Sequence, residues 1–209
     1  MFTLYDYREH LTGLGLSPAT IRCYVEALVR LRRWADSESI RFDKLGPTQV
    51  AAYAETVPAS WATRRHLRSA LIHWANMTKR QSLAGAVRVP RKPKMVCRAY
   101  DPDEVRMIAL TAYKRQDGPG AAVLCALYLG LRRAEIAALR WDAFSDDGEW
   151  VTVTGKGQVT ATLPVHPVLK DALKRLPRSD AYVFPGKSGG PSSPARIWNW
   201  IRRVGAEAG

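Results

Sequence analysis

The stretch that decides the fold of this chain is Leu129-Gly130-Leu131-Arg132-Arg133-Ala134-Glu135-Ile136, and Thr154-Gly155-Lys156-Gly157 follows it. The first stretch predicts an arginine, Arg132, at the start of a helix. The second predicts Lys156 in a tight hairpin. A guanidinium can hold a phosphate through two parallel hydrogen bonds, and a hairpin lysine can supply a point charge or a proton. Together they predict metal-free phosphoryl chemistry on a nucleic-acid backbone.

The composition favours a nucleic-acid partner. The 209 residues carry a net charge of +13, and the isoelectric point is about 10.1. This balance implies a polyanionic partner, with nucleic acid ahead of an anionic membrane. The longest nearly apolar run, residues 120–131, is too short to span a bilayer. No basic segment followed by an apolar one opens the chain, so a secreted protein is not indicated.

The three cysteines, Cys23, Cys97 and Cys125, are odd in number and widely spaced. They fit neither a disulfide framework nor a zinc site, and we expect reduced thiols and no metal. Two of them lie in apolar helical contexts, where a small buried hydrophobic role is the simplest reading.

Residues 1–84 predict a bundle of four amphipathic helices. A short helix covers residues 3–15, and Ser17-Pro18 starts the second helix with a capping serine and a proline in its first turn. A third helix runs from Gly46-Pro47 to Val57-Pro58, and a fourth begins near Ser60. Short turns between such helices are typical of a bundle. We expect three tryptophans in its core: Trp34, Trp61 and Trp74.

Basic residues of this bundle and of the following segment are candidates for DNA contact. On the fourth helix a basic face is predicted opposite Leu67 and Leu71, and the second helix has a weaker claim. Residues 85–98 contain two prolines, five basic residues and no acid, which predicts a cationic linker. A solvated surface and a solvated spacer remain the alternatives. The candidates are Thr20, Arg22, Arg64, Arg65, Arg68, Arg91, Lys92 and Lys94.

Residues 99–209 predict a partial α+β domain. Helices are expected over residues 101–114, 121–129, 134–141, 167–176 and 195–205. Strands at 150–154 and 159–163 form the hairpin, and Val159, Ala161 and Leu163 alternate with threonines as in a half-buried strand. Residues 182–184 are short and β-like. The fold class is therefore mainly α with a small antiparallel β-sheet.

These motifs resemble the tyrosine recombinases, the phage integrase and Xer-type family, over nearly the whole chain. Residues 17–24 resemble the second helix of the family's core-binding domain, and residues 100–105 resemble the opening of its catalytic domain. Residues 128–142 match the family's first arginine box, and Thr154-Gly155-Lys156-Gly157 matches its lysine hairpin. The order and spacing of these motifs make the set specific, although Gly-Lys-Gly alone is weak.

The resemblance implies that a tyrosine attacks a DNA phosphodiester, leaving a 3′-phosphotyrosine and a free 5′-hydroxyl, without a cofactor or metal. Arg132 would clamp the phosphate, Lys156 would be the general acid, and Glu135 would orient the arginine; for Glu135 a plain helix-start acid is the alternative. The partner would be double-stranded DNA, with a monomer alone and a tetramer on DNA for the complete enzyme. A cytoplasmic protein of a bacterium or its phage, without an arm-binding domain, is implied.

The sequence also departs from the family pattern. It contains no His-x-x-Arg box, and no tyrosine follows at the place of the nucleophile. We interpret Tyr182 as a packing residue and His166 as an ordinary capping residue. The chain is therefore expected to be a fragment that binds DNA and does not cleave it. A non-catalytic DNA-binding regulator on the same scaffold is the second hypothesis, and a basic RNA-binding helical protein is a more distant third.

Overall fold

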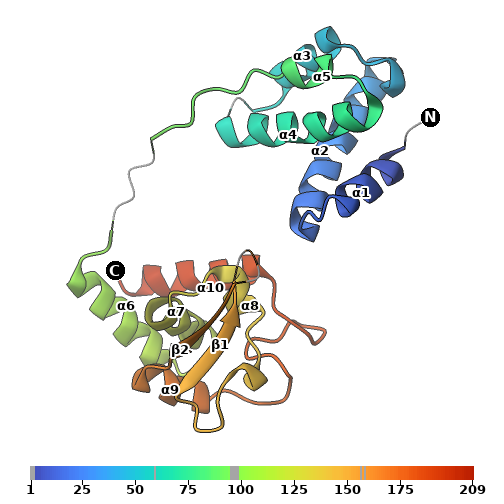
Figure 1. Cartoon of the computed structure of the whole chain (residues 1–209). Helices are drawn as coiled ribbons and strands as arrows, with labels where there is room; N and C mark the ends of the chain where they lie inside the picture. Colours follow the sequence, from blue (N-terminus) through green and yellow to red (C-terminus); the bar gives the residue numbers. More distant parts are fainter. Residues whose placement is uncertain (1–2, 59, 95–98, 156, 158) are drawn as a thin grey trace. The chain divides into compact units, whose positions relative to one another are not determined.

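A computed structural model of the chain describes residues 3–58, 60–94, 99–155, 157 and 159–209. The chain divides into two compact units, Met1–Val96 and Cys97–Gly209, and each is described by itself (Figure 1). The elements agree with the expected class, mainly α with one small antiparallel sheet.

The first unit is helical. Serine or threonine side chains cap three of its helices, because Thr3, Ser17 and Ser60 each accept a hydrogen bond from the backbone three residues on. Proline occupies the first turn of α2 and of α3. The elements are α1 (Leu4–Gly13), α2 (Pro18–Ser37), the 3-10 turn η1 (Phe42–Lys44), α3 (Pro47–Thr56), α4 (Trp61–Thr78) and α5 (Ser82–Gly85).

The core of this unit lies where α2 and α4 pack against each other and against α1. Tyr7 is fully buried and donates a hydrogen bond from its hydroxyl to the Ala70 carbonyl at 2.8 Å. Trp74 lies in the core and Trp34 packs against it, as predicted, whereas Trp61 is half-buried and lies outside the core cluster. Val87 is buried in the same core, so the chain leaves the unit later than the predicted linker start at residue 85.

The second unit surrounds the apolar helix α7. Helices α6, α9 and α10 contact α7, and the hairpin of β1 and β2 lies beside them (Figure 1). Its elements are α6 (Pro102–Arg115), α7 (Gly118–Leu129), α8 (Arg133–Ala137), η2 (Trp141–Ala143), β1 (Trp150–Thr154), β2 (Thr160–Pro164), α9 (Pro167–Lys174) and α10 (Pro194–Glu207).

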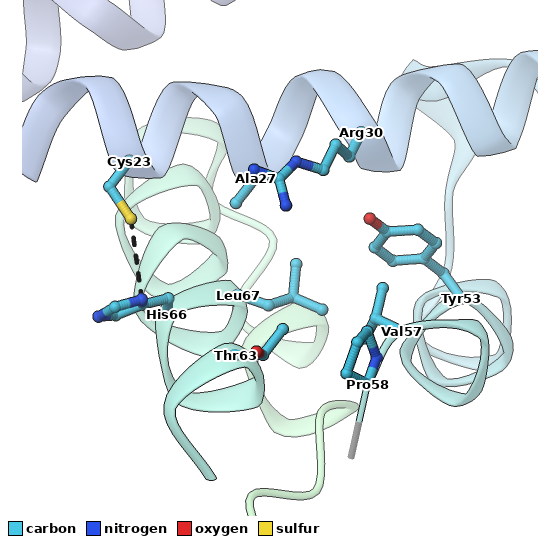
Figure 2. A pocket seen from close by; sticks show the side chains of 9 residues that line it. All are labelled: Cys23, Ala27, Arg30, Tyr53, Val57, Pro58, Thr63, His66 and Leu67. Carbon is cyan, nitrogen blue, oxygen red and sulfur yellow. Dashed lines mark hydrogen bonds between the residues drawn. The ribbon is translucent and has the colours of Figure 1, made fainter. Parts of the chain in front are cut away.

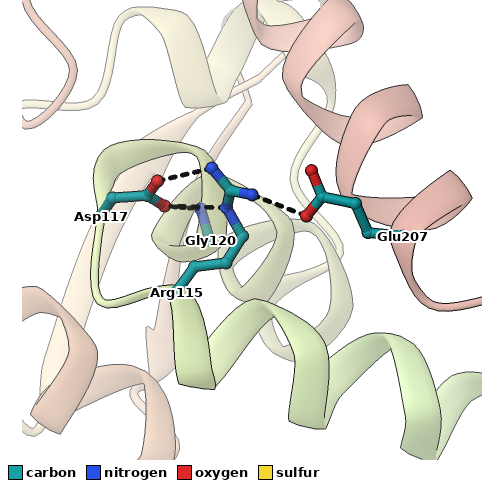
Figure 3. Close-up of polar contacts among 4 residues, drawn as sticks. All are labelled: Arg115, Asp117, Gly120 and Glu207. Carbon is teal, nitrogen blue, oxygen red and sulfur yellow. Dashed lines mark hydrogen bonds and ion pairs between the residues drawn. The ribbon is translucent and has the colours of Figure 1, made fainter.

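An ion network joins the corner between α6 and α7 to the end of α10 (Figure 3). Arg115 donates to Asp117 at 2.7 and 3.2 Å and to Glu207 at 2.6 Å. Asp117 also accepts from the Gly120 backbone at 2.9 Å, which caps the first turn of α7. The Arg115 guanidinium thus connects the end of α6, the start of α7 and the end of α10.

Three expectations for this unit need correction. The predicted helix 134–141 is shorter, since α8 ends at Ala137. Val159 and Ala161 are exposed, and of their alternating set only Leu163 packs against the core, because β2 is the outer strand of a sheet of only two strands. Residues 182–184 form no strand; Tyr182 makes a single bridge with Arg140.

Candidate active site

Arg132 lies at the N-cap of α8, as the sequence predicts for a helix start. Gly130 ends α7 with a left-handed backbone (φ 63°), which glycine adopts without strain. Leu131 is buried next to it, and this anchors the short connection. The backbone of Arg132 is extended, and its side chain is 69% exposed. The arginine therefore projects from a rigid corner of the core into solvent.

Glu135 positions this arginine through two hydrogen bonds. One carboxylate oxygen accepts from the Arg132 backbone N–H at 2.8 Å, and the other accepts from the Arg132 guanidinium Nη1, also at 2.8 Å. The Glu135 side chain is only 13% exposed. The backbone hydrogen bond of Arg132, followed by its side-chain hydrogen bond, lowers the pKa of Glu135 below its ordinary value despite the partial burial. The carboxylate is thus charged at neutral pH and fixes both ends of Arg132.

The hairpin base lies against this pair. A Cβ built on Gly155 would be 3.1 Å from Glu135 Oε1 and 3.6 Å from Arg132 Nη1. The pairing of Thr154 with Thr160 and the hydrogen bond from Gly155 N to Val159 O at 2.8 Å set the hairpin register. Gly155, at the end of the first strand of the hairpin, therefore lies beside the Arg132–Glu135 pair. Lys156, the predicted general acid, lies outside the described residues.

Two further side chains behave as the sequence predicts. His166 is the N-cap of α9, accepts from Val168 N at 3.3 Å, and stacks on Tyr128 with ring centroids 4.1 Å apart. Tyr182 is half-buried and packs under the guanidinium of Arg140 at 5.4 Å. Arg140 also donates to the Asp142 carboxylate at 2.5 to 3.1 Å, a contact that was not predicted from the sequence.

The basic face predicted on α4 needs one correction. Arg64 is not exposed: its side chain is 8% exposed and donates to both carboxylate oxygens of Glu55, at 2.9 and 3.1 Å. It lies on the same side of α4 as Leu67 and Leu71, which are buried. Arg65 and Arg68 are exposed, as are Arg22, Arg91, Lys92 and Lys94, and Thr20 is half-buried. A DNA contact for these seven residues stays a prediction.

The Trp61 ring contacts two of these cations, which was not predicted from the sequence. The Arg65 guanidinium lies 4.9 Å from the Trp61 ring centroid, and the Lys92 ammonium lies 5.4 Å from it. Lys92 comes from the segment after the last helix of the unit, whereas Arg65 comes from the first turns of α4. An aromatic face attracts cations through its quadrupole. Trp61 therefore gathers two positive charges that lie far apart in the sequence.

Within the described residues, no group of three or more His, Cys, Asp or Glu side chains is placed to hold a metal ion. A search of the same residues finds no helix long and apolar enough to cross a membrane. Cys125 is buried as predicted, whereas Cys23 is half-buried, and Cys97 lies outside the described residues.

Comparisons with known proteins point to one group of enzymes. No protein-family model matches the sequence. The tyrosine recombinase XerC of Xanthomonas axonopodis pv. citri is 30% identical over 185 residues, which cover 83% of this chain and 61% of the relative. The tyrosine recombinase XerC of Xylella fastidiosa (strain M23) is 25% identical over 211 residues, covering 93% of this chain and 72% of that one.

The fold also matches solved recombinase structures. A lambda integrase tetramer bound to a Holliday junction superposes with a TM-score of 0.68 at 18% identity, over 99% of this chain and 65% of that chain. At this identity the likeness establishes the fold. The chain spans 61% of the length of its Xanthomonas relative.

Proposed function

Because the chain belongs to the tyrosine recombinase family, we propose that it is the DNA-binding and phosphate-binding part of a site-specific DNA recombinase. Such an enzyme cleaves and rejoins strands through a 3′-phosphotyrosine. The first unit binds duplex DNA through exposed cations on α2, on α4 and in the segment that follows α5. The second unit holds the scissile phosphate.

One observation carries this proposal: the exposed guanidinium of Arg132 is anchored on the half-buried Glu135, with Gly155 of the hairpin against both. Glu135 uses one donor of the guanidinium, and an arginine has five. The remaining donors are available to a phosphate oxygen. Preorganised cations stabilise the negative charge that collects on the equatorial oxygens in phosphoryl transfer. Arg132 supplies that charge, and Glu135 is the positioning residue.

Lys156 is proposed as the general acid that protonates the leaving 5′-oxygen. The support is its place in the sequence directly after Gly155, whose position beside Arg132 brings the turn to the arginine. A 5′-thiol leaving group needs no such proton. In a product of this reading frame that also contains the nucleophilic tyrosine, Lys156→Ala should slow cleavage of ordinary DNA, and a 5′-bridging phosphorothiolate should restore the rate. Without that rescue the general-acid role is wrong.

We propose that the 209 residues bind DNA without cleaving it. None of the four histidines begins a His-x-x-Arg sequence. The same observation favours a second candidate, a non-catalytic DNA-binding regulator on the recombinase scaffold. A nicked suicide duplex distinguishes these ideas from an active enzyme, because a covalent protein–DNA adduct with this chain would overturn both.

Duplex binding is tested by fluorescence anisotropy at several salt concentrations. Each neutralised phosphate releases counterions, so the affinity should fall steeply as salt increases. Unlabelled duplex DNA should compete better than RNA of the same length. A flat salt response, or stronger competition by RNA, would contradict the proposal.

The finer expectations on assembly and location are part of the same proposal. We expect a monomer in solution and a tetramer on DNA for the complete enzyme, in the cytoplasm of a bacterium or of a phage host. Light scattering of the chain alone tests the monomer, and light scattering of the complete enzyme on its DNA site tests the tetramer. A stable tetramer without DNA would contradict it.

A further inference from the structure

A small pocket of ≈ 170 Å³ lies between α2, α3 and α4 of the first unit (Figure 2). Its polar wall is built by Cys23 and Arg30 of α2, Tyr53 of α3, and Thr63 and His66 of α4. From the sequence alone, only Cys23 of this group has a predicted role, as a small buried hydrophobic residue. A thiol, an imidazole and a guanidinium around one cavity are chemically unlike an apolar core.

The thiol and the imidazole face each other across two helices. Cys23 Sγ lies 3.8 Å from His66 Nδ1, which is within hydrogen-bond distance for sulfur (Figure 2). The cysteine is half-buried, so small molecules in solution can reach it. The thiolate is the nucleophilic form of cysteine, and a neighbouring histidine promotes it by accepting the proton. This pair has the arrangement of an activated thiol.

Cys125 provides the contrast within the same chain. It lies fully buried in α7, and burial raises the pKa of its thiol to about 12. A thiol in such surroundings is inert. Cys125 is therefore the unreactive reference thiol in the same chain, and the effect of His66 on Cys23 is measured with His66→Gln.

The pocket surroundings connect Cys23 to the proposed DNA contacts. Thr20 precedes Cys23 by one turn on the same side of α2, and Arg22 is its exposed neighbour. His66 is the neighbour of Arg65 on α4. The Cys23–His66 contact thus joins the two helices that carry the candidate DNA-binding side chains. A change at the sulfur alters the spacing or charge between them.

The size of the pocket limits what can react. A water molecule occupies about 30 Å³ of liquid, so the pocket holds only a few non-hydrogen atoms. Addition of a single oxygen to sulfur fits within this space. Arg30 lines the same pocket (Figure 2), where its guanidinium is ion-paired with Glu26 at 3.5 Å.

We propose that Cys23 is a peroxide-reactive thiol activated by His66, and that its oxidation to sulfenic acid weakens DNA binding. His66 accepts the thiol proton, and the thiolate attacks one oxygen of a hydroperoxide. The S–O bond forms as the O–O bond breaks, so sulfur loses two electrons and the peroxide gains them. The leaving oxygen takes the proton from His66 and departs as water or an alcohol. The effect on DNA binding rests on the proposed function, whereas the reaction itself does not.

The reaction is tested with hydrogen peroxide and dimedone, which traps sulfenic acid, followed by mass spectrometry. A Cys97→Ser background removes the remaining thiol that the structure does not describe. Cys23 should be labelled and Cys125 should not. His66→Gln should slow labelling of Cys23 by about tenfold, because only a few per cent of an ordinary thiol is ionised at neutral pH. Equal rates with and without His66 would overturn the activated pair, as would faster labelling of Cys125.

The coupling is tested by duplex affinity before and after peroxide, with Cys23→Ser as the matched control. Oxidation should weaken binding by roughly tenfold, the cost of one lost contact in a protein–DNA interface. The affinity of Cys23→Ser should not respond to peroxide. An unchanged affinity of the oxidised chain would overturn the coupling. If the reduced chain fails to bind duplex DNA while Cys23 still reacts through His66, the proposed function is wrong and the thiol site stands.

Discussion

Each unit of the molecule contains an arginine–glutamate pair, and the two pairs are exposed in opposite ways. In the first unit the Arg64 side chain is 8% exposed and its partner Glu55 is 73% exposed. In the second unit Arg132 is 69% exposed and Glu135 is 13% exposed. Glu55 uses two guanidinium nitrogens of Arg64, whereas Glu135 uses one nitrogen of Arg132 and also the backbone N–H. The first pair presents a carboxylate to solvent, and the second presents a guanidinium.

This difference separates a structural ion pair from a binding site. Arg64 is almost fully covered and donates from two nitrogens to Glu55, so it contributes to the packing of α4 and does not present these donors to a phosphate. Arg132 is held by an acid beneath it and keeps donors directed outward. An acidic partner therefore prevents phosphate binding when it occupies the solvent-facing side of the guanidinium. It favours phosphate binding when it lies on the protein side and leaves the outward donors free.

The largest expected difference between Arg132 and Arg64 is in the rate of strand cleavage. In a product of this reading frame that supplies the nucleophilic tyrosine, Arg132→Ala should reduce strand cleavage by about a thousandfold, since a preorganised transition-state donor is lost. Arg64→Ala should leave the rate per folded molecule unchanged. Single-turnover cleavage of a labelled duplex measures both. Equal losses in the two variants would end the distinction.

Thermal stability should depend more on Glu55 of the first unit than on Glu135 of the second. Glu55→Gln leaves the buried Arg64 guanidinium without a charged partner, so the Tm of the first unit should fall clearly. Glu135→Gln leaves an amide oxygen for the Arg132 N–H and an exposed guanidinium, so the cost should be at most about 1 kcal/mol. Thermal unfolding followed by circular dichroism compares them. A larger loss for Glu135→Gln would contradict this account of the two pairs.

The pH dependence sharpens the same comparison. Hydrogen bonds from the arginine partner lower the pKa values of Glu55 and Glu135 below the ordinary 4.5. A carboxyl whose pKa is lower in the folded state stabilises the fold above its unfolded pKa, and this stabilisation disappears as the pH falls through the folded value. The Tm difference between wild type and either glutamine variant should thus be present at pH 7 and vanish as the pH decreases below 4.5. A difference that grows on acidification would contradict the sign.

The smallest effect concerns Trp61. Trp61→Leu removes two cation–π contacts with exposed cations, each worth about 0.5–1 kcal/mol, and should weaken duplex binding by roughly threefold with little change in Tm. Trp74→Leu is the matched control, because Trp74 is in the core. It should lower the Tm and leave the affinity of the folded molecule unchanged. If Trp61→Leu lowered the Tm as much as Trp74→Leu, Trp61 would be a packing residue.

The helix starts were predictable because their chemistry is local. Ser17-Pro18 and Asp101-Pro102 carry their own caps, and the structure begins α2 and α6 there. The roles of Arg64 and Trp61 were not predictable in this way. Helical spacing places Arg64 on the side of Leu67 and Leu71, but its partner Glu55 lies on α3, and this contact between two helices cannot be read from the spacing within α4. The role of Trp61 depends on its contact with Lys92. The two residues are far apart in the sequence, so helical periodicity does not predict this contact.

The proposed function requires Arg132 and Lys156 to act on one phosphodiester. A selection from random duplexes supplies the binding site, and single methylphosphonates then remove the charge of one phosphate at a time. At one position the substitution should weaken wild-type binding by about tenfold, and the loss at that same position should be smaller in both Arg132→Ala and Lys156→Ala. If the two variants lose their sensitivity at two different phosphates, the two side chains do not share a scissile linkage and the account is wrong.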